Sequence, residues 1–173
     1  MKRILLTAFL LTSACCLSQP SVVSEIYLLS PQGTTEEIGS IKITQTLEGL
    51  LFEVDLNNLP TGQHGFHIHE NGRCLPSQNP KGELVLAGQA GGHYDPENTN
   101  HHLGPKGAGH KGDLPFLLAD KEGKVKTSFY HPRLTLKEIK NRSLVIHKNG
   151  DNYQDKPVPL GGGGDRIACG VIE

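Results

Sequence analysis

The chain has 173 residues, with 17 Lys and Arg against 18 Asp and Glu, and only nine aromatic residues. This length suits one domain with a core, and no internal change of composition indicates a second domain. The near-neutral charge and the lack of basic runs or interleaved aromatic residues argue against a nucleic-acid partner.

The first 18 residues have the layout of a secretory signal. Lys2 and Arg3 precede an apolar run over residues 4–11, and small residues follow it. The run is too short to span a bilayer, and nothing caps it as a buried helix. Residues 11–15 also resemble an imperfect lipoprotein cleavage box, in which Cys15 would carry lipid. We therefore expect export, with a domain over residues 22–173 that is free or anchored through Cys15.

Short segments in which apolar and polar residues alternate predict half-buried strands. Phe52, Val54 and Leu56, for example, would share one face of a strand. A weak helical period occurs only in residues 134–140, where Thr135 could cap a short turn. The predicted strands cover residues 23–29, 38–44, 50–56, 65–69, 116–119, 125–130, 143–147 and 167–171. About eight short strands with little helix predict an antiparallel sandwich or barrel.

Two long segments have no strand or helix period. Residues 73–115 are rich in Gly, Pro, Asn and His. A stretch of that length inside a compact domain is either disordered or held by something other than a core. Residues 149–165 include four consecutive glycines at 161–164, which permit close backbone approach but also suit a flexible loop.

Two of the four cysteines, Cys15 and Cys16, fall in the leader, which leaves Cys74 and Cys169 for the domain. Two cysteines in an exported domain are expected to pair, because free thiols fit an oxidising compartment poorly. The bridge would close a loop of 95 residues (169 minus 74), worth about 4 to 5 kcal/mol. It would tie the start of the first long segment to the last strand.

Most of the nine histidines occur in clusters with metal-ligand spacing. His67 and His69, two apart on a predicted strand, would project from the same face. Further nitrogen and carboxylate donors follow at His93, His101, His102, His110, Asp113 and His147. Histidines with one Asp suit a tetrahedral zinc site, and four imidazoles suit copper(II). The only methionine is Met1, so a soft copper(I) carrier site is not available.

Four segments of the chain stand out: Gly-Phe-His-Ile-His-Glu at 65–70, Gly-Gly-His-Tyr-Asp-Pro at 91–96, Gly-Ala-Gly-His-Lys-Gly-Asp-Leu-Pro at 107–115, and the glycine-rich end at 161–172. Together and in this order they resemble the signature segments of bacterial copper/zinc superoxide dismutases. The resemblance runs from about residue 22 to the C-terminus. It implies an eight-stranded antiparallel Greek-key barrel or sandwich with two long functional loops, copper and zinc as cofactors, and a periplasmic location.

The resemblance also implies a ligand set. Copper would be bound by His67, His69, His93 and His147, and zinc by His93, His102, His110 and Asp113, with His93 shared. The family spacing His-x-Gly-Pro favours His102 over its neighbour His101 as the zinc ligand. The remaining histidines, His64, His101 and His131, are interpreted as surface residues.

Two further residues match positions around the family's metals. Asp151 matches the carboxylate that accepts hydrogen bonds from one copper histidine and one zinc histidine. Its alternative is an exposed turn aspartate. Arg166 matches the arginine that guides the anion to copper, with an exposed strand-edge arginine as the alternative. Which lysines assist it is open among Lys106, Lys111 and Lys148.

The implied reaction is the dismutation of superoxide to oxygen and hydrogen peroxide in two half-steps, for antioxidant defence in the cell envelope. The bridging ring of His93 would release one metal, take up a proton and later return both. Without Lys2 and Arg3 the domain has 15 cations against 18 anions, a net charge near −3. Local cations would therefore decide how the anion is captured, because net charge is screened beyond roughly 8 Å.

Two other functions compete with this interpretation. His-x-His with a third histidine also builds the open zinc site of a carbonic-anhydrase-like hydratase, which leaves the other donors and Arg166 unused. A periplasmic metal buffer or copper carrier on the same fold would hold labile metal without turnover. The sequence leaves the oligomeric state open between a monomer and a homodimer.

Overall fold

The computed structural model describes residues 19–173, so the expected leader and Cys15 lie outside the described residues. The regular elements of the described chain are mostly β-strands. Its strands are β1 (Ser21–Ser30), β2 (Gly33–Thr46), β3 (Gly49–Leu56), β4 (Gly62–His64), β5 (Phe66–His69), β6 (Ser77–Gln78), β7 (Leu84–Val85), β8 (Leu117–Ala119), β9 (Val125–His131), β10 (Arg142–His147) and β11 (Arg166–Ile172). The helices are η1 (Gly88–Ala90), α1 (Leu136–Ile139) and η2 (Leu160–Gly162).

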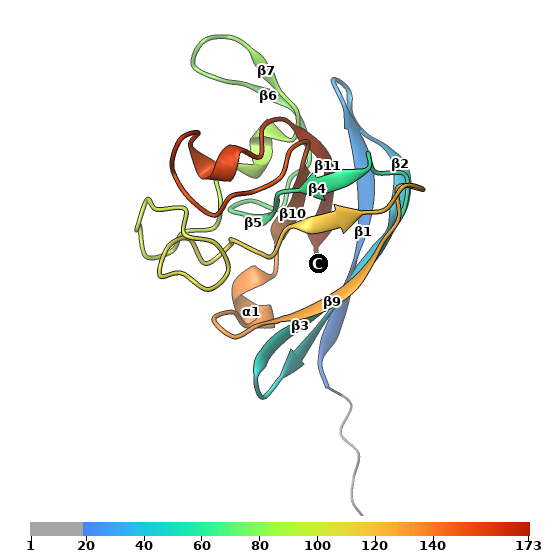
Figure 1. The fold of residues 1–173 in the computed structure, drawn as a ribbon, viewed down its shortest axis with the longest axis vertical. Coiled ribbons are helices and arrows are strands. Elements are labelled where there is room, and N and C mark those ends of the chain that lie inside the picture. The colour runs from blue at the N-terminus through green and yellow to red at the C-terminus, as the bar shows by residue number, and fades with distance from the viewer. Residues whose placement is uncertain (1–18) are drawn as a thin grey trace, which may run out of the picture.

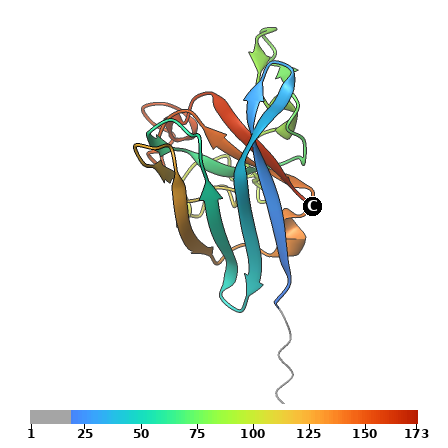
Figure 2. The same cartoon turned by 90° about the vertical axis from the view of Figure 1, so that its right-hand side faces the viewer.

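Seven strands form one antiparallel sheet in the order β5-β10-β11-β1-β2-β3-β9. The long strands β1, β2 and β3 run side by side, and the sheet curls around its buried face (Figures 1 and 2). Along β3, Leu50, Phe52, Val54 and Leu56 are buried and alternate with more exposed residues. This alternation confirms the predicted pattern and gives the sheet one apolar face.

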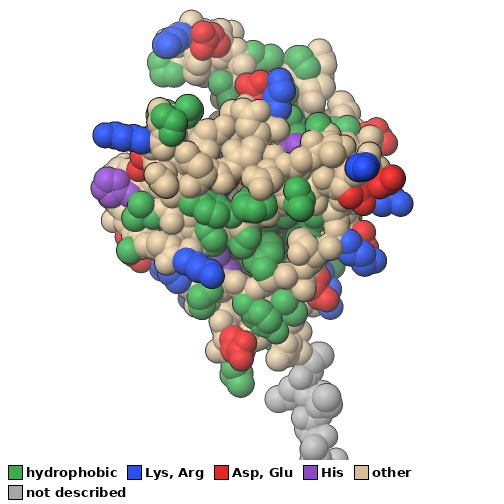
Figure 3. Space-filling model, in the orientation of Figure 1, with side chains coloured by type: hydrophobic (Ala, Val, Ile, Leu, Met, Phe, Trp, Pro, Cys, Tyr) green, Lys and Arg blue, Asp and Glu red, His purple; other side chains and the backbone are tan. Residues whose placement is uncertain are grey.

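The core fills the inside of the curled sheet. Its largest members include Phe52 and Phe66, and Phe129 stacks on Phe52 with ring centroids 5.0 Å apart. The pair β4–β8 forms a separate two-stranded sheet. Viewed as in Figure 1, hydrophobic and uncharged side chains occupy the middle of the surface, and most charged side chains lie around its edge (Figure 3).

The predicted all-β antiparallel class is confirmed, but the strand count differs. All eight predicted segments overlap strands, whereas residues 19–173 contain eleven. The additional strands are β4, β6 and β7. β4 was not predicted because Pro60, just before it, and Gly62, at its start, are typical turn residues. β6 and β7 have only two residues each, too few to show a period. The predicted helix is confirmed as α1, whose N-cap Thr135 forms a capping box with Glu138.

The two long loops gather on one side of the sheet, at the left of Figure 1. The predicted disulfide joins Cys74 to Cys169 in β11, with a Cα–Cα distance of 5.8 Å. It therefore ties the start of the first loop to the sheet. Within residues 19–173, no helix has the length and apolar character needed to cross a membrane.

Candidate metal centre

Two paired strands carry three of the predicted copper ligands. β5 pairs antiparallel with β10, with His69 opposite Ser143 and His67 opposite Val145. His147 ends β10, and its backbone N–H donates to the carbonyl of Gly65 at 2.8 Å. The strand register therefore brings together three side chains that are far apart in the sequence.

His93 reaches the same place from the first long loop. An isolated antiparallel bridge pairs it with His69, and its ring stacks on that of His67 with centroids 3.9 Å apart. The donor atoms of His67, His69, His93 and His147 all lie within 4.8 Å of one another. We call these four residues the strand group, because three of them stand on strands.

The ring nitrogens of the strand group are arranged to leave donor atoms free. His69 Nδ1 donates to the carbonyl of Gly91, and His147 Nδ1 donates to that of Gly164, both at 3.0 Å. A neutral imidazole has one N–H, so these bonds leave Nε2 of each ring as a lone pair. Within residues 19–173 those two Nε2 atoms and Nδ1 of His67 are buried without a hydrogen-bond partner. Buried polar atoms are normally satisfied, so three unpaired imidazole nitrogens in one cluster fit a site that could hold a metal ion.

A second set of donors surrounds the carboxylate of Asp113. His93 Nδ1 lies 3.0 Å from Oδ1, His110 Nδ1 lies 3.3 Å from Oδ1, and His102 Nδ1 lies 3.0 Å from Oδ2. We call His93, His102, His110 and Asp113 the loop group, because all four lie on the first long loop. Three imidazoles and one carboxylate are the donor set of a tetrahedral zinc site.

One group of donor atoms around Asp113 differs in one member from the predicted zinc ligands. Donor atoms of His67, His93, His102 and Asp113 lie within 4.8 Å of one another, so His67 stands in the place of His110. The second nitrogen of His67 is engaged by Asp151, and the ring belongs to a strand. We therefore keep His67 with the strand group and His110, which contacts Asp113, with the loop group. His93 belongs to both clusters.

Asp151 joins the two groups. Its Oδ2 accepts a hydrogen bond from His67 Nε2 and its Oδ1 accepts one from His102 Nε2, both at 2.8 Å. The side chain is buried, so the alternative of an exposed turn aspartate is wrong. The glycine-rich loop is fitted to this carboxylate. Gly161 has φ 71°, and a Cβ there would overlap Asp151 Oδ1 and His102 Nε2.

Burial and local charges set the protonation of these groups. Burial lowers the pKa of His67 and His69, and burial opposed by the Gly164 carbonyl lowers that of His147 to about 4. Burial also acts against the charged form of His102, but the carboxylates of Asp113 and Asp151 outweigh it and raise the pKa to about 9. The strand group is therefore neutral and ready to bind metal at neutral pH.

A cavity of about 710 Å³ opens onto the strand group. His69, His93 and His147 line it, together with Lys148, Arg166 and apolar residues from the loops around it. Arg166 Nη1 donates to the carbonyl of Ala87 at 2.6 Å, and Nη2 donates to that of Gly91 at 2.7 Å. Arg166 is thus fixed at the cavity, and the alternative of an exposed strand-edge arginine is wrong.

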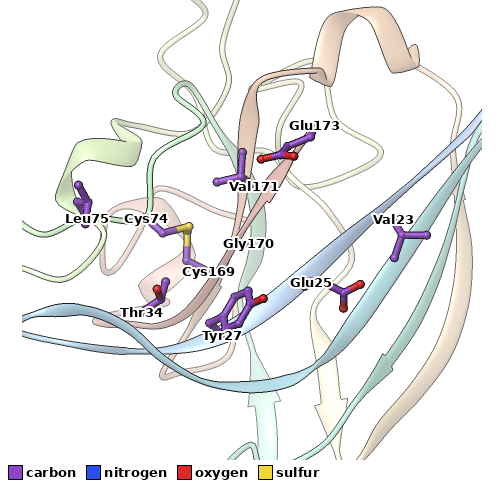
Figure 4. Close-up of a pocket in the computed structure, with 10 residues that line it drawn as sticks. All are labelled: Val23, Glu25, Tyr27, Thr34, Cys74, Leu75, Cys169, Gly170, Val171 and Glu173. Carbon is purple, nitrogen blue, oxygen red and sulfur yellow. A yellow bond between two sulfur atoms is a disulfide. The ribbon is translucent and has the colours of Figure 1, made fainter.

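A second pocket, of about 470 Å³, lies on another part of the surface beside the disulfide (Figure 4). Tyr27, Glu25 and Val171 line it with seven further residues, none of which is a histidine. None of the predicted metal ligands contributes to it. Of these two pockets, only the first is lined by predicted metal ligands, namely His69, His93 and His147.

Two of the predicted surface histidines are buried, so that interpretation was wrong. His64 is 1% exposed, with Nδ1 2.8 Å from the carbonyl O of His147 and Nε2 2.7 Å from that of Pro60. His131 is fully buried at the end of β9. Both residues lie at the end of a strand, where the neighbouring residues in the sequence do not reveal whether a histidine is buried or exposed. His101 is exposed, as predicted.

The structure also separates the residues that the sequence left open. His102, not His101, lies beside Asp113. Lys148 lines the cavity, whereas Lys111 is paired with Glu97 and Glu138 at 3.4 and 3.3 Å. Lys106 is not among the residues that line it.

Comparison with known proteins gives a consistent result. Residues 37–172 match the family model described as copper/zinc superoxide dismutase (SODC). The superoxide dismutase [Cu-Zn] of Brucella abortus is 48% identical over 174 aligned positions, which cover 100% of both chains. The solved Cu/Zn superoxide dismutase from Brucella abortus covers 89% of this chain and 100% of its own at 52% identity, with a TM-score of 0.86. The solution structure of the monomeric copper, zinc superoxide dismutase from Salmonella enterica has 48% identity, the same coverage and a TM-score of 0.78.

Proposed function

Because this chain belongs to the copper/zinc superoxide dismutase family, we propose that the strand group holds the redox-active copper and the loop group holds a structural zinc. The reaction consumes two superoxide anions and two protons and yields one oxygen and one hydrogen peroxide. The observation that carries the assignment is the set of buried nitrogens without partners, on His67, His69 and His147, around one point beside a solvent-accessible cavity.

The proposed copper ligands are His67, His69, His93 and His147, and the proposed zinc ligands are His93, His102, His110 and Asp113. Copper, when bound, supplies the one-electron couple that the two half-reactions need. The other nitrogens of His67 and His102 donate to Asp151, and those of His69 and His147 donate to the carbonyls of Gly91 and Gly164, which fixes the orientation and tautomer of these four rings.

His93 would serve both metals through one ring. Its Nδ1 faces Asp113 in the loop group, which leaves Nε2 for the strand group. To use both nitrogens the ring must give up its N–H proton, and Nε2 can later hold a proton for delivery to the reduced product. The stacked ring of His67 limits the movement of His93 during this exchange.

Arg166 would capture the anionic substrate together with Lys148. Its guanidinium lies at the cavity wall and has no carboxylate partner within 4.0 Å in the described chain, so its charge is available to an anion. Local cations of this kind raise the capture rate of small anions. Arg166→Glu should lower the second-order rate constant and its salt dependence with both metals still bound. Unchanged kinetics would contradict this role.

We also propose that the protein works in the periplasm, either free after removal of residues 1–18 or, where cleavage falls before Cys15, anchored through lipid on that residue. The disulfide supports an oxidising compartment. The intact mass of the mature protein, purified from a membrane fraction and from a soluble fraction, tests both points. An unmodified N-terminus beyond Cys16 would contradict the anchor.

Of the two assembly states open from the sequence, the monomer is proposed, because the Salmonella enterica relative of 48% identity is described as monomeric. Sedimentation equilibrium measures the assembly state directly.

Metal analysis combined with a superoxide assay tests the central proposal. One copper and one zinc per chain, with activity that is lost on chelation and restored by copper, are expected. A protein that holds only zinc and is inactive toward superoxide would contradict it.

A further inference from the structure

The first long loop meets the rest of the protein on two sides near the loop group. On one side, Asp151 and Asp155 contact His102 through its side chain and its backbone N–H. On the other side lies the segment from the end of β9 through α1, residues 131–142. We call this segment the platform. The platform carries none of the proposed metal ligands, so the ligand assignment leaves its contacts with the loop without a role.

Arg133 connects the platform to the backbone of the loop. Its Nη1 donates to the carbonyl of Gly109 at 3.3 Å, and its Nη2 donates to the carbonyl of His110 at 3.1 Å. Within residues 19–173 no carboxylate lies within 4.0 Å of its guanidinium. Both terminal nitrogens are therefore used on the backbone of the loop, in the fork geometry that guanidinium favours.

The carbonyl of His110 has a second role. It also accepts a hydrogen bond from the backbone N–H of Asp113, at 3.4 Å, which closes the turn that carries two members of the loop group. That bond is long, so the turn gains little rigidity from it alone. The charged guanidinium at the same oxygen makes a stronger hydrogen bond and fixes the position of the turn.

The platform is rigid enough to transmit this constraint. Leu134 and Ile139 are buried in the core, and the backbone N–H of Leu136 donates to Gln45 Oε1 in β2 at 3.0 Å. The capping box of Thr135 and Glu138 closes α1 between them. Glu138 in turn contacts Lys111 of the loop at 3.3 Å. Arg133 thus extends from an anchored base.

We propose that Arg133 is a positioning residue for zinc, which acts by holding the His110–Asp113 turn in its binding geometry. The proposal rests on the assignment of zinc to the loop group. Substituting residues that orient metal ligands typically costs 10- to 100-fold in metal affinity. Arg133→Gln should therefore release zinc about tenfold faster than the unaltered protein, with copper release changed by less than about twofold.

The test compares holoproteins that have lost one positive charge at different places. Arg133→Gln is paired with Lys126→Gln, because Lys126 lies in β9 and its exposed Nζ forms an ion pair with exposed Asp55, at 3.1 Å. Zinc and copper release to a chromogenic chelator are followed separately, and the absorption spectrum of cobalt(II) loaded in place of zinc reports the ligand geometry. Faster zinc release and an altered cobalt spectrum in Arg133→Gln alone would support the positioning role. Equal zinc release in the two variants would overturn it.

Two additional variants keep the outcomes distinct. His110→Ala removes a proposed zinc ligand, and zinc content unchanged by that variant would overturn the zinc assignment itself. If Arg133→Gln fails to fold, Arg133→Lys decides, because lysine keeps the charge but cannot bridge two carbonyls as a planar fork. Zinc release from Arg133→Lys that is faster than from the unaltered protein would support the proposal, and a rate equal to that of the unaltered protein would overturn it.

Discussion

The strand group and the loop group bring their donor side chains together in different ways. His67, His69 and His147 stand on strands whose register is fixed by the sheet, so their convergence follows from strand pairing. His102 and His110 belong to no strand and are placed by contacts from Asp151, Asp155 and Arg133. A regular element gives precision through its own backbone, whereas an irregular one depends on side chains from elsewhere.

The largest effect should come from removing the residue that both groups share. His93→Ala deletes one donor from each group, so both metals should be held less tightly and activity should fall by about two orders of magnitude or more. Metal content and the superoxide rate constant measure this. His101→Ala, an exposed neighbour of the loop group, is the control and should change neither. Loss of one metal alone would mean that His93 is not shared.

The substitution Asp151→Asn should weaken the loop group more than the strand group. Asparagine keeps the shape but presents an amide N–H₂ to one of the rings that now donates to a carboxylate oxygen. His67 should stay in place because β5 fixes it, whereas His102 should shift. Zinc affinity should therefore fall about 10- to 100-fold and copper affinity by clearly less, as measured by competition with chelators of known affinity. Equal losses of affinity for both metals would contradict the view that the loop group depends on Asp151 more than the strand group does.

Gly161→Ala examines the same contact from the backbone. The new Cβ would overlap Asp151 Oδ1 and His102 Nε2, so zinc retention should weaken, with a smaller effect than Asp151→Asn. Gly162→Ala is the matched control. Its φ of +79° is equally unfavourable for alanine, but the nearest atom to its Cβ is 3.7 Å away. Similar zinc release in the two variants would show that backbone strain, not the overlap, is responsible.

The smallest effect on metal binding should come from His64→Gln. The buried ring contacts the carbonyls of His147 and Pro60, and glutamine cannot reach both in the same geometry. An unsatisfied buried carbonyl costs about 1–3 kcal/mol, so the metal-free protein should unfold at lower urea concentration. Zinc content should not change. An unfolding midpoint equal to that of the unaltered protein would contradict a structural role for His64.

Features that depend on local sequence patterns could be predicted, whereas features that depend on contacts between distant residues could not. Alternation along residues 50–56 and the spacing of His67 and His69 are local patterns, and they correctly predicted the strands β3 and β5. The burial of His64 and His131 depends on contacts with residues distant in the sequence, and no local pattern encodes it. The two-residue strands β6 and β7 were missed for lack of a period. Arg133 was missed because its partners are backbone carbonyls, which leave no mark on the identity of the residues that carry them.

The disulfide has a consequence for when the protein becomes competent. Cys169 lies three positions after Arg166 in β11, and the loop that starts at Cys74 supplies both carbonyls to which Arg166 donates. A copy retained in a thiol-rich interior would lack that tether, and its guanidinium would lose a fixed direction. Under the export proposed above, oxidation of the two thiols would act as a maturation step that fixes Arg166 at the cavity.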